Sequence, residues 1–341
     1  MNQIKWGFIG TGRIIPRFME GFRQVPDASP AAIYGRNISK ATALAEKYGF
    51  QKVFDDIDVF VESSGIDVAY IAVTHPLHLS FAKKCLEAGI PVVCEKPMAP
   101  NLKQEEEIVQ CARKHNVFLM EGMWSRMFPI TEQILAWLKE GRIGEIVGMN
   151  GLFCIKTYPS TTDRLYDPEQ AGGALLDIGI YLVSLAQLVF GTSPKNIASL
   201  SNISSFGVDD RMGAVFQYED GAIATLLSSF QSEGRDCATI YGTDGIIEIF
   251  EDFWRPRHAR MTCRNGIIDF NCPEAQADTS VYGSQVSFCG EGYQFEINHV
   301  NECLRKGLKE SPIMTLADSL QVMGVCDRLR DIWGLKYPFE K

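Results

Sequence analysis

A short apolar strand that runs directly into a glycine turn opens the chain, and this feature limits the possible folds more than any other. The segment 4–9 reads IKWGFI, and after it come Gly10, Thr11, Gly12, Arg13, Ile14 and Ile15. Glycine allows backbone conformations that a Cβ forbids, and the following helix would offer unpaired N–H groups and a partial positive charge to a pyrophosphate. The pattern predicts a dinucleotide cradle over residues 10–14. Ile15 stands where the G-x-G-x-x-G/A fingerprint has Gly or Ala, and a tight turn that binds nothing is the alternative interpretation.

The rhythm of apolar runs changes near residue 122 and divides the chain in two. From residue 4 to about 120, short apolar runs alternate with helical patterns, which is typical of a parallel sheet doubly wound with helices. Later hairpin signals at 219–221, 243–245 and 265–266 join β-rich runs, so their strands should be antiparallel neighbours. We therefore predict an α/β dinucleotide-binding domain over 1–122 and an α+β domain with a mostly antiparallel sheet over 123–341.

Helix caps and apolar runs set the expected elements. Ser39 should cap a helix that ends at the left-handed Gly49, and Gly191 should end another. The expected strands are 4–9, 31–34, 68–73, 91–94 and 117–120, and a further run covers 145–155. The expected helices are 14–22, 40–48, 77–88, 102–115, 129–139, 175–190, 293–306 and 315–333.

Composition excludes several classes of partner. The chain has 341 residues, 46% hydrophobic and 22% charged, which is enough for two domains with buried cores. Its net charge of −9 and the lack of a Lys or Arg cluster argue against nucleic acid, whose binding proteins carry a basic stripe. The first strand is expected to begin at Ile4, which leaves no room for a signal peptide. We also expect no apolar run to reach the roughly 18 residues of a membrane helix. We expect a cytoplasmic protein without a membrane partner.

Neither the histidines nor the cysteines suggest a metal site. Among five histidines only His75 and His78 are close together, and no carboxylates accompany them at ligand spacing. The ten cysteines are scattered without a C-x-x-C pair, as expected for small core residues. No metal cofactor is therefore expected.

The end of the second strand bears on the choice of cofactor. In a dinucleotide fold, an acidic residue there selects NAD and a basic one accommodates the 2′-phosphate of NADP. Here the residues are Tyr34, Gly35, Arg36 and Asn37, and Arg36 is suited to a charge-assisted fork with a phosphate. The pattern favours NADP. The alternative is that Arg36 is a solvated turn residue and that either cofactor, NAD or NADP, is accepted.

Two further stretches contain residues suited to chemistry. Lys96, in the segment 95–97, follows a strand of the parallel sheet, where open α/β sheets bind their ligands. In the segment 172–181, which reads GGALLDIGIY, Asp177 and Tyr181 are four positions apart. On a helix both would project from the same face.

A set of spaced motifs resembles the glucose-fructose oxidoreductase and inositol dehydrogenase family, Gfo/Idh/MocA. The motifs are the glycine turn, 74–78 (THPLH), 95–97 (EKP), 121–126 (EGMWSR) with Phe128 and Pro129, and 164–168 (RLYDP) leading into 172–181. Many members of the family carry His at the position of Tyr181. A Tyr there is similar to the branch of dihydrodiol dehydrogenase and NADP-dependent xylose dehydrogenase. The resemblance implies an N-terminal Rossmann domain, a C-terminal open sheet, and homodimers or homotetramers built on the outer face of that sheet.

The resemblance also implies a reaction and a set of site residues. A hydride would pass between nicotinamide C4 and a carbinol or carbonyl carbon of a sugar, polyol or cyclic diol. Besides the turn and Arg36, the implied cofactor contacts are Thr74, His75, His78, Glu95, Lys96, Trp124 and Arg126. The implied substrate contacts are Lys96, Trp124, Arg164, Asp177 and Tyr181, with a pocket shaped by loops such as 158–163.

The implied catalytic residues are Lys96, Tyr181 and Asp177. A tyrosine hydroxyl, with a pKa of about 10, acts as acid and base near neutral pH only if the phenolate is favoured. A lysine about 4 Å away would favour it by about 4 kcal/mol at an effective dielectric of 20, or roughly three pKa units. Asp177 would orient a hydroxyl or the lysine.

Other interpretations of these residues remain open. Tyr181 on an apolar helix is otherwise a core tyrosine, and Trp124 and Arg126 are equally suited to packing between domains. A non-catalytic nucleotide sensor on the same fold is the main alternative function. An enzyme of another substrate class, similar to biliverdin reductase, is a third possibility.

Overall fold

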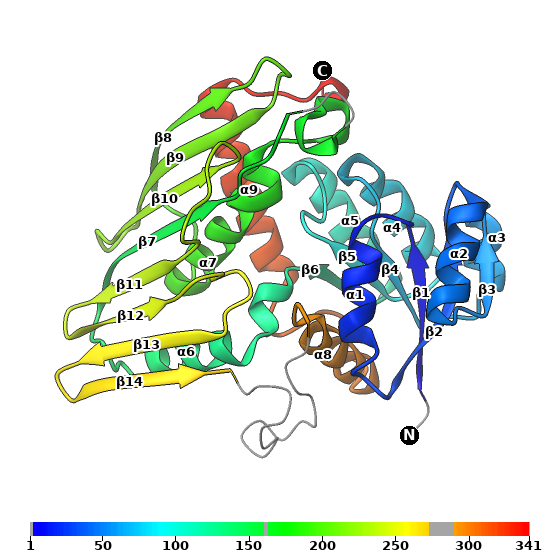
Figure 1. Cartoon of the computed structure of the whole chain (residues 1–341), viewed down its shortest axis with the longest axis horizontal. Coiled ribbons are helices and arrows are strands. Elements are labelled where there is room, and N and C mark those ends of the chain that lie inside the picture. The colour runs from blue at the N-terminus through cyan, green and yellow to red at the C-terminus, as the bar shows by residue number, and fades with distance from the viewer. Residues whose placement is uncertain (1–2, 160–162, 273–289, 341) are drawn as a thin grey trace. The chain divides into compact units, whose positions relative to one another are not determined.

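A computed structural model of the chain describes residues 3–159, 163–272 and 290–340. Residues 160–162 of the predicted substrate loop lie outside this range. The described chain forms two compact units, drawn in Figure 1. The first unit takes in residues 3–127 and 290–319, and the second takes in 128–272 and 320–340. The first unit therefore extends beyond the predicted 1–122 domain and includes a later segment of the chain.

The first unit is a six-stranded parallel sheet with the order β3-β2-β1-β4-β5-β6. Its strands are β1 (Ile4–Ile9), β2 (Ala28–Tyr34), β3 (Lys52–Phe54), β4 (Val68–Ile71), β5 (Val92–Glu95) and β6 (Leu119–Gly122). Its helices are α1 (Ile14–Phe22), α2 (Ile38–Tyr48), α3 (Ile57–Ser63), α4 (His78–Glu87), α5 (Leu102–His115) and α8 (Tyr293–Arg305). The strand order reverses beside β1, as in dinucleotide-binding folds. The predicted fold class of this half is confirmed.

An aromatic core joins α1 to the sheet. Phe18 is fully buried on the apolar face of α1, and its ring stacks on that of Tyr70 in β4, with centroids 4.0 Å apart and an angle of 19°. Phe8 in β1 meets both rings edge-on. Burial of each Phe side chain contributes about 1.5–3 kcal/mol, so this cluster fixes the helix that follows the glycine turn.

Helix α8 completes the first unit although it lies almost 300 residues after β1. The indole N–H of Trp6 donates to Asn301 Oδ1 at 3.0 Å, and Asn301 Nδ2 donates to Asp27 Oδ1 at 3.1 Å. At the contact with α1, a Cβ on Gly21 would come within 2.6 Å of the Gln294 backbone nitrogen. Helices α1 and α8 therefore approach each other closely, and the first unit needs both parts of the chain.

The second unit is an eight-stranded sheet with the order β14-β13-β12-β11-β7-β10-β9-β8. Its strands are β7 (Ile146–Cys154), β8 (Asn196–Ile203), β9 (Asp209–Gln217), β10 (Ile223–Ser229), β11 (Ala238–Gly242), β12 (Gly245–Ile249), β13 (His258–Cys263) and β14 (Gly266–Asn271). Neighbours are antiparallel except β7 and β10. Helices α6 (Pro129–Lys139) and α7 (Ile180–Phe190) pack on this sheet (Figure 1). Helix α9 (Leu316–Trp333) begins in the first unit and continues in the second. The mostly antiparallel second sheet is confirmed.

Local details differ from the prediction in three places. Helix α2 is capped by Asn37, whose Oδ1 accepts the Lys40 N–H, so the predicted cap at Ser39 is wrong, while Gly49 ends the helix with φ 83° as predicted. Strand β3 and helix α3 were not expected, because a three-residue strand carries no clear period. The predicted helix 175–190 begins instead as a π-helical turn, Leu175–Gly179, and continues as α7.

One apolar stretch also corrects the composition argument. The stretch Pro168–Phe190 is long and apolar enough to cross a membrane, so the judgement that no run reaches this length is wrong. Its burial is that of a core helix, because 78% of its most apolar 18-residue segment is buried inside the protein.

Candidate active site

The glycine turn lies between the ends of β1, β2 and β4. Gly10 has φ +124°, and its N–H donates to the Tyr34 carbonyl at 2.9 Å. A Cβ on Gly10 would overlap the carbonyl oxygen of Ala72, so this glycine is required by the fold itself. Gly12 is exposed, and a Cβ there would meet only that same oxygen, at 3.7 Å. Space is therefore left on the outer side of the turn.

The start of α1 is open to an anion. Arg13 occupies the N-cap position, and its side chain makes no capping hydrogen bond. The first N–H groups of a helix have no partner within the helix, and they attract phosphate oxygens. The turn and the helix start therefore fit the pyrophosphate of a dinucleotide. Ile15, the departure from the fingerprint, is fully buried in the core below.

Arg36 lies beside the turn, because the methyl group of Thr11 packs on Gly35. A Cβ on Gly35 would come within 2.5 Å of Thr11 Cγ2. The Arg36 side chain is exposed at this strand end. Burial raises the pKa of Tyr34 at this strand end, and the charge of Arg36 lowers it. Asp56 and Asp55, which were not predicted as site residues, also raise this pKa and therefore lie near the same strand end. The local charge is therefore mixed.

His78 joins the loops after β4 and β5. Its Nδ1 lies 3.0 Å from the Pro97 carbonyl oxygen, and its Nε2 lies 3.1 Å from that of Val73. An imidazolium donates to both oxygens and a neutral ring to one. His75 is also buried, with its ring centroid 5.8 Å from that of His78, and Thr74 precedes it in an extended conformation. His78 therefore joins the loop that carries Lys96 to the loop after β4.

Lys96 stands at the carboxyl end of β5, half-buried, before a cis peptide bond to Pro97. Below it the Tyr70 hydroxyl donates to Glu95 Oε1 at 2.5 Å, and burial together with Glu95 raises the pKa of Tyr70 well above its usual range. Burial and then Glu95 also raise the pKa of Glu296 well above its usual range. Glu95, next to Lys96, is thus linked to Tyr70 and Glu296, two residues from distant parts of the sequence.

Glu121 accepts a hydrogen bond from the backbone two residues after Lys96. Its Oε1 accepts the Met98 N–H at 3.0 Å. Burial raises the pKa of this carboxyl, while the hydrogen bond from Met98 and the charges of Arg126 and Lys96 act in the opposite direction. Glu121 opens the motif 121–126, but nothing in the sequence indicated this contact with the loop after Lys96.

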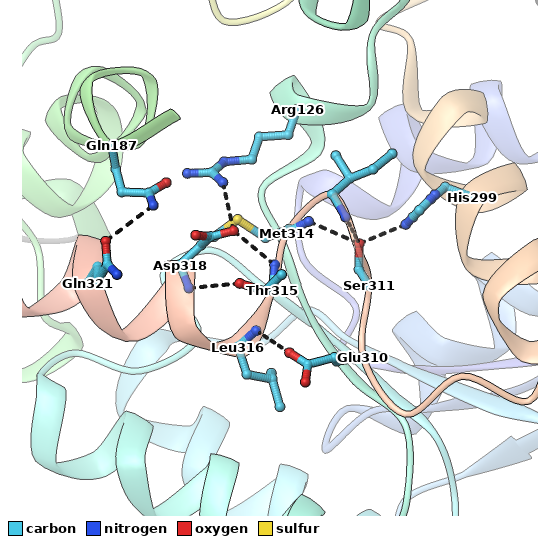
Figure 2. A network of polar contacts seen from close by, with 11 residues as sticks. Arg126, Gln187, His299, Glu310, Ser311, Met314, Thr315, Leu316, Asp318 and Gln321 are labelled. Atoms are coloured by element: carbon cyan, nitrogen blue, oxygen red, sulfur yellow. Dashed lines mark hydrogen bonds and ion pairs between the residues drawn. The ribbon is translucent and has the colours of Figure 1, made fainter. Parts of the chain in front are cut away.

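Trp124 and Arg126 are both buried within the first unit. The Trp124 ring stacks on that of Tyr293 with centroids 4.1 Å apart. Arg126 Nη1 lies 3.4 Å from Asp318 Oδ2, as Figure 2 shows, and burial lowers the pKa of the guanidinium. Asp318 also accepts the Thr315 N–H at 3.2 Å and so caps α9. Both predicted site residues therefore contact the late segment of the chain.

In the second unit the structure brings two predicted residues together. Arg164 Nη2 lies 2.7 Å from Asp177 Oδ1, and the Asp177 side chain is largely buried. Tyr181 is in the first turn of α7, with 7% of its surface exposed. Its ring centroid is 5.8 Å from that of Phe153 and 6.2 Å from that of Trp254. Trp254 was not predicted, because it stands in a loop without a motif.

Models of known families match both units. The family described as "Oxidoreductase family, NAD-binding Rossmann fold", GFO_IDH_MocA, matches residues 4–123, and the GFO/IDH/MocA C-terminal domain matches 131–248. The chain belongs to the Gfo/Idh/MocA oxidoreductase family. The predicted resemblance is confirmed.

Relatives within the Gfo/Idh/MocA family extend over the whole chain. The trans-1,2-dihydrobenzene-1,2-diol dehydrogenase of Xenopus tropicalis is 36% identical over 338 residues, covering 98% of this chain and 99% of the relative. The enzyme of that name in Homo sapiens is 30% identical over 341 residues, covering 99% of each.

Solved structures of similar fold include enzymes with bound nicotinamide cofactors. A 3-ketoreductase from Actinomadura kijaniata, in complex with NADP and TDP-benzene, has a TM-score of 0.82 at 23% identity over 97% of this chain and 98% of its own. A levoglucosan dehydrogenase in complex with NADH and levoglucosan has a TM-score of 0.85 at 20% identity, covering 97% of each chain. At these identities the likeness establishes the fold alone.

Proposed function

We propose that the chain is an NAD(P)-dependent dehydrogenase that oxidises a secondary hydroxyl of a cyclic diol, with sugars and polyols as further substrates. The observation that carries this proposal is the 36% identity, over 98% of the chain, to a trans-1,2-dihydrobenzene-1,2-diol dehydrogenase. The open start of α1 beneath Gly10 and Gly12 supports binding of a dinucleotide. Gly10, Gly12 and the start of α1 would hold the dinucleotide, whose nicotinamide would supply hydride transfer at the substrate carbon.

The residues of the chain handle the proton that remains on the substrate oxygen. Tyr181 takes this proton during oxidation and returns it during reduction. Lys96 favours the phenolate by its charge, and Asp177, paired with Arg164, orients the substrate hydroxyl. The position of Tyr181 at the start of a helix, among aromatic rings that exclude water, supports this role.

The test is a substitution of Tyr181 by Phe, measured with NADP+ and NAD+ on trans-dihydrobenzenediol and on a panel of sugars. We expect kcat to fall by about 10²–10⁴-fold, which is the usual contribution of an acid/base group, while NADPH binding stays unchanged. Tyr218→Phe is the matched control, because it removes a buried phenol that stacks on Phe190 at the far end of α7. Full turnover by Tyr181→Phe would contradict the assignment, and tight cofactor binding without turnover of any substrate would favour a nucleotide sensor.

NADP is the preferred cofactor in this proposal because Arg36 is an exposed cation at the end of β2. The variant Arg36→Ala should weaken the apparent affinity for NADP+ by about tenfold or more and leave that for NAD+ nearly unchanged, because a hydrogen bond to a charged group contributes about 1.5–3 kcal/mol. Arg17→Ala, an exposed arginine on α1, is the control. Equal losses for both cofactors would contradict the preference.

The enzyme assembles as a homodimer through the outer face of the second sheet, and two such dimers would make a tetramer. Leu200 is 83% exposed there, and Leu227 and Val215 on the neighbouring strands are also exposed. An apolar, self-complementary sheet face suits a second copy of the chain. Leu227→Lys should give monomers by sedimentation, whereas Val59→Glu on α3 should not. Monomeric wild-type protein would contradict this assembly.

The cytoplasm is the proposed location. Nine cysteines of the described chain are free thiols, which suits a reducing compartment. Secretion of the active native protein from its own cells would contradict this location.

A further inference from the structure

We propose, on the basis of the function above, that Asp209 is a positioning residue whose carboxylate fixes the double-glycine turn before Asp177 and Tyr181. Asp209 is the first residue of β9 and is fully buried. Its Oδ2 accepts the N–H of Leu175, the first residue of the π-helical turn, at 2.7 Å. A carboxylate at the start of a helix is stabilised by the helix dipole, so this bond sets where the turn begins.

The double-glycine turn, Gly172 and Gly173, shows how tightly this arrangement is built. Gly173 has φ +120°, and a Cβ there would overlap Asp209 Oδ1. A Cβ on Gly172 would come within 2.6 Å of the Arg164 carbonyl oxygen. The turn therefore has Asp209 on one side and the backbone of Arg164 on the other. Any shift of the turn would move both partners of the Arg164–Asp177 ion pair.

A second hydrogen bond holds the same turn from the C-terminal end of the chain. The hydroxyl of the fully buried Tyr337 donates to the Gly172 carbonyl at 2.7 Å. The guanidinium of Arg330 lies over the Tyr337 ring, 4.8 Å from its centroid, and pairs with Glu340 at 2.8 Å. Asp209 and Tyr337 thus hold the turn independently, from different elements.

The electrostatics of Asp209 make its role measurable. Burial raises the pKa of Asp209 to about 7, Asp210 adds to this rise, and the Leu175 and Asp209 N–H groups and the charge of Arg330 oppose it. Tyr337 also interacts with Asp209; its own pKa is raised well above the usual range by burial and by Asp209, so it stays neutral. Near neutral pH, protonation therefore replaces a charge-assisted hydrogen bond by a neutral one of about half the strength.

The experiment compares Asp209→Asn with Asp210→Asn, a neighbouring carboxylate that accepts from Asn202 and Gln231 instead. Values of kcat and KM are measured from about pH 5.5 to 8.5, across the pKa of Asp209. Wild-type kcat should decline as the pH falls through about 7. Asp209→Asn should lower kcat at pH 8 by about tenfold, a change of about 1.4 kcal/mol in the barrier, and should make this decline shallower, because only the pH dependence of proton transfer by Tyr181 is then left. The KM for the cofactor should stay unchanged. Asp210→Asn should keep the wild-type kcat at pH 8 and keep the decline, moved to slightly lower pH because the Asp210 charge no longer raises the pKa of Asp209.

Two further variants separate the possible outcomes. Tyr337→Phe removes the other hydrogen bond and should lower kcat by several-fold while the decline near pH 7 remains, which keeps the proposal testable if Asp209→Asn does not fold. Wild-type kcat and pH profile in Asp209→Asn would overturn the positioning role, as would an unchanged kcat in Tyr337→Phe. Tyr181→Phe is measured in parallel. Full activity of that variant would instead refute the proposed function.

Discussion

Gly10 and Gly12 occupy the same turn, yet the structure gives them different roles, and alanine at each position tests this difference. An alanine at position 10 must adopt φ +124°, which costs an L-residue about 1–3 kcal/mol. Its Cβ would also overlap the Ala72 carbonyl oxygen and lie 2.9 Å from the carbonyl carbon. Ala72 cannot move aside freely, because its own N–H donates to the Ile9 carbonyl at 2.9 Å.

These terms set the size of the expected effect. Overpacking of a core contact costs about 1–3 kcal/mol, so Gly10→Ala should lower the free energy of unfolding of the first unit by about 2–6 kcal/mol. For a unit of this size, that is a fall in Tm of roughly 5–20 °C. Gly12→Ala meets only an ordinary contact at 3.7 Å and should change Tm little. Its methyl group would stand where the pyrophosphate approaches, so NADPH affinity should fall by about tenfold or more.

Calorimetry without cofactor measures the first effect, because two compact units can melt in separate transitions. Titration of NADPH fluorescence measures the second. A Gly10→Ala protein that melts like the wild type would refute the argument from φ and contact distance. A Gly12→Ala protein with wild-type cofactor affinity would show that the cofactor does not approach this turn.

Two other predictions concern stability. Burial lowers the pKa of His299 to about 4, so the unfolded chain, with a histidine pKa of about 6.5, binds the proton first as the pH falls. The free energy of unfolding should therefore drop by at most about 3 kcal/mol between pH 6.5 and 4. In urea titrations at several pH values, His299→Gln should remove most of this dependence on pH. An unchanged dependence would show that His299 is not its source. Asp318→Ala removes both an ion-pair partner of the buried Arg126 and a hydrogen bond that caps α9, and should lower the free energy of unfolding by about 3 kcal/mol. Asp331→Ala, an exposed change in the same helix, should lower it by less than about 0.5 kcal/mol, and equal losses would count against the ion pair.

Features of the fold that depend on residues close together in the sequence were predictable. The strands of the parallel sheet are short apolar runs, and the left-handed glycines Gly49 and Gly191 end their helices as predicted. The π-helical turn was not predictable, since LLDIG has the composition of an ordinary helix and the hydrogen bonds made around it by Asp209 and Tyr337 come from distant parts of the sequence. Strand β3 was too short for its period to be recognised.

Long-range contacts account for the rest of what the sequence did not reveal. The bond between Trp6 and Asn301 joins residues 295 positions apart, and it is one reason that the first unit needs α8 as well as residues 3–127. No periodicity or spacing rule connects such residues. The same holds within the candidate site, where Arg164 and Asp177 were each predicted from a motif, but Trp254 beside Tyr181 was not.

Both candidate functional loops are held by a buried carboxylate outside their motifs. In the first unit, Glu121 accepts the Met98 N–H two positions after Lys96, and in the second, Asp209 accepts the Leu175 N–H two positions before Asp177. In both cases burial raises the pKa of the carboxyl. Desolvation of a carboxylate costs several kcal/mol, and a neutral side chain of similar size would avoid that cost. The arrangement is therefore better explained by accurate positioning of the loop backbone than by stability, and the geometry of each loop depends on a residue that its motif does not contain.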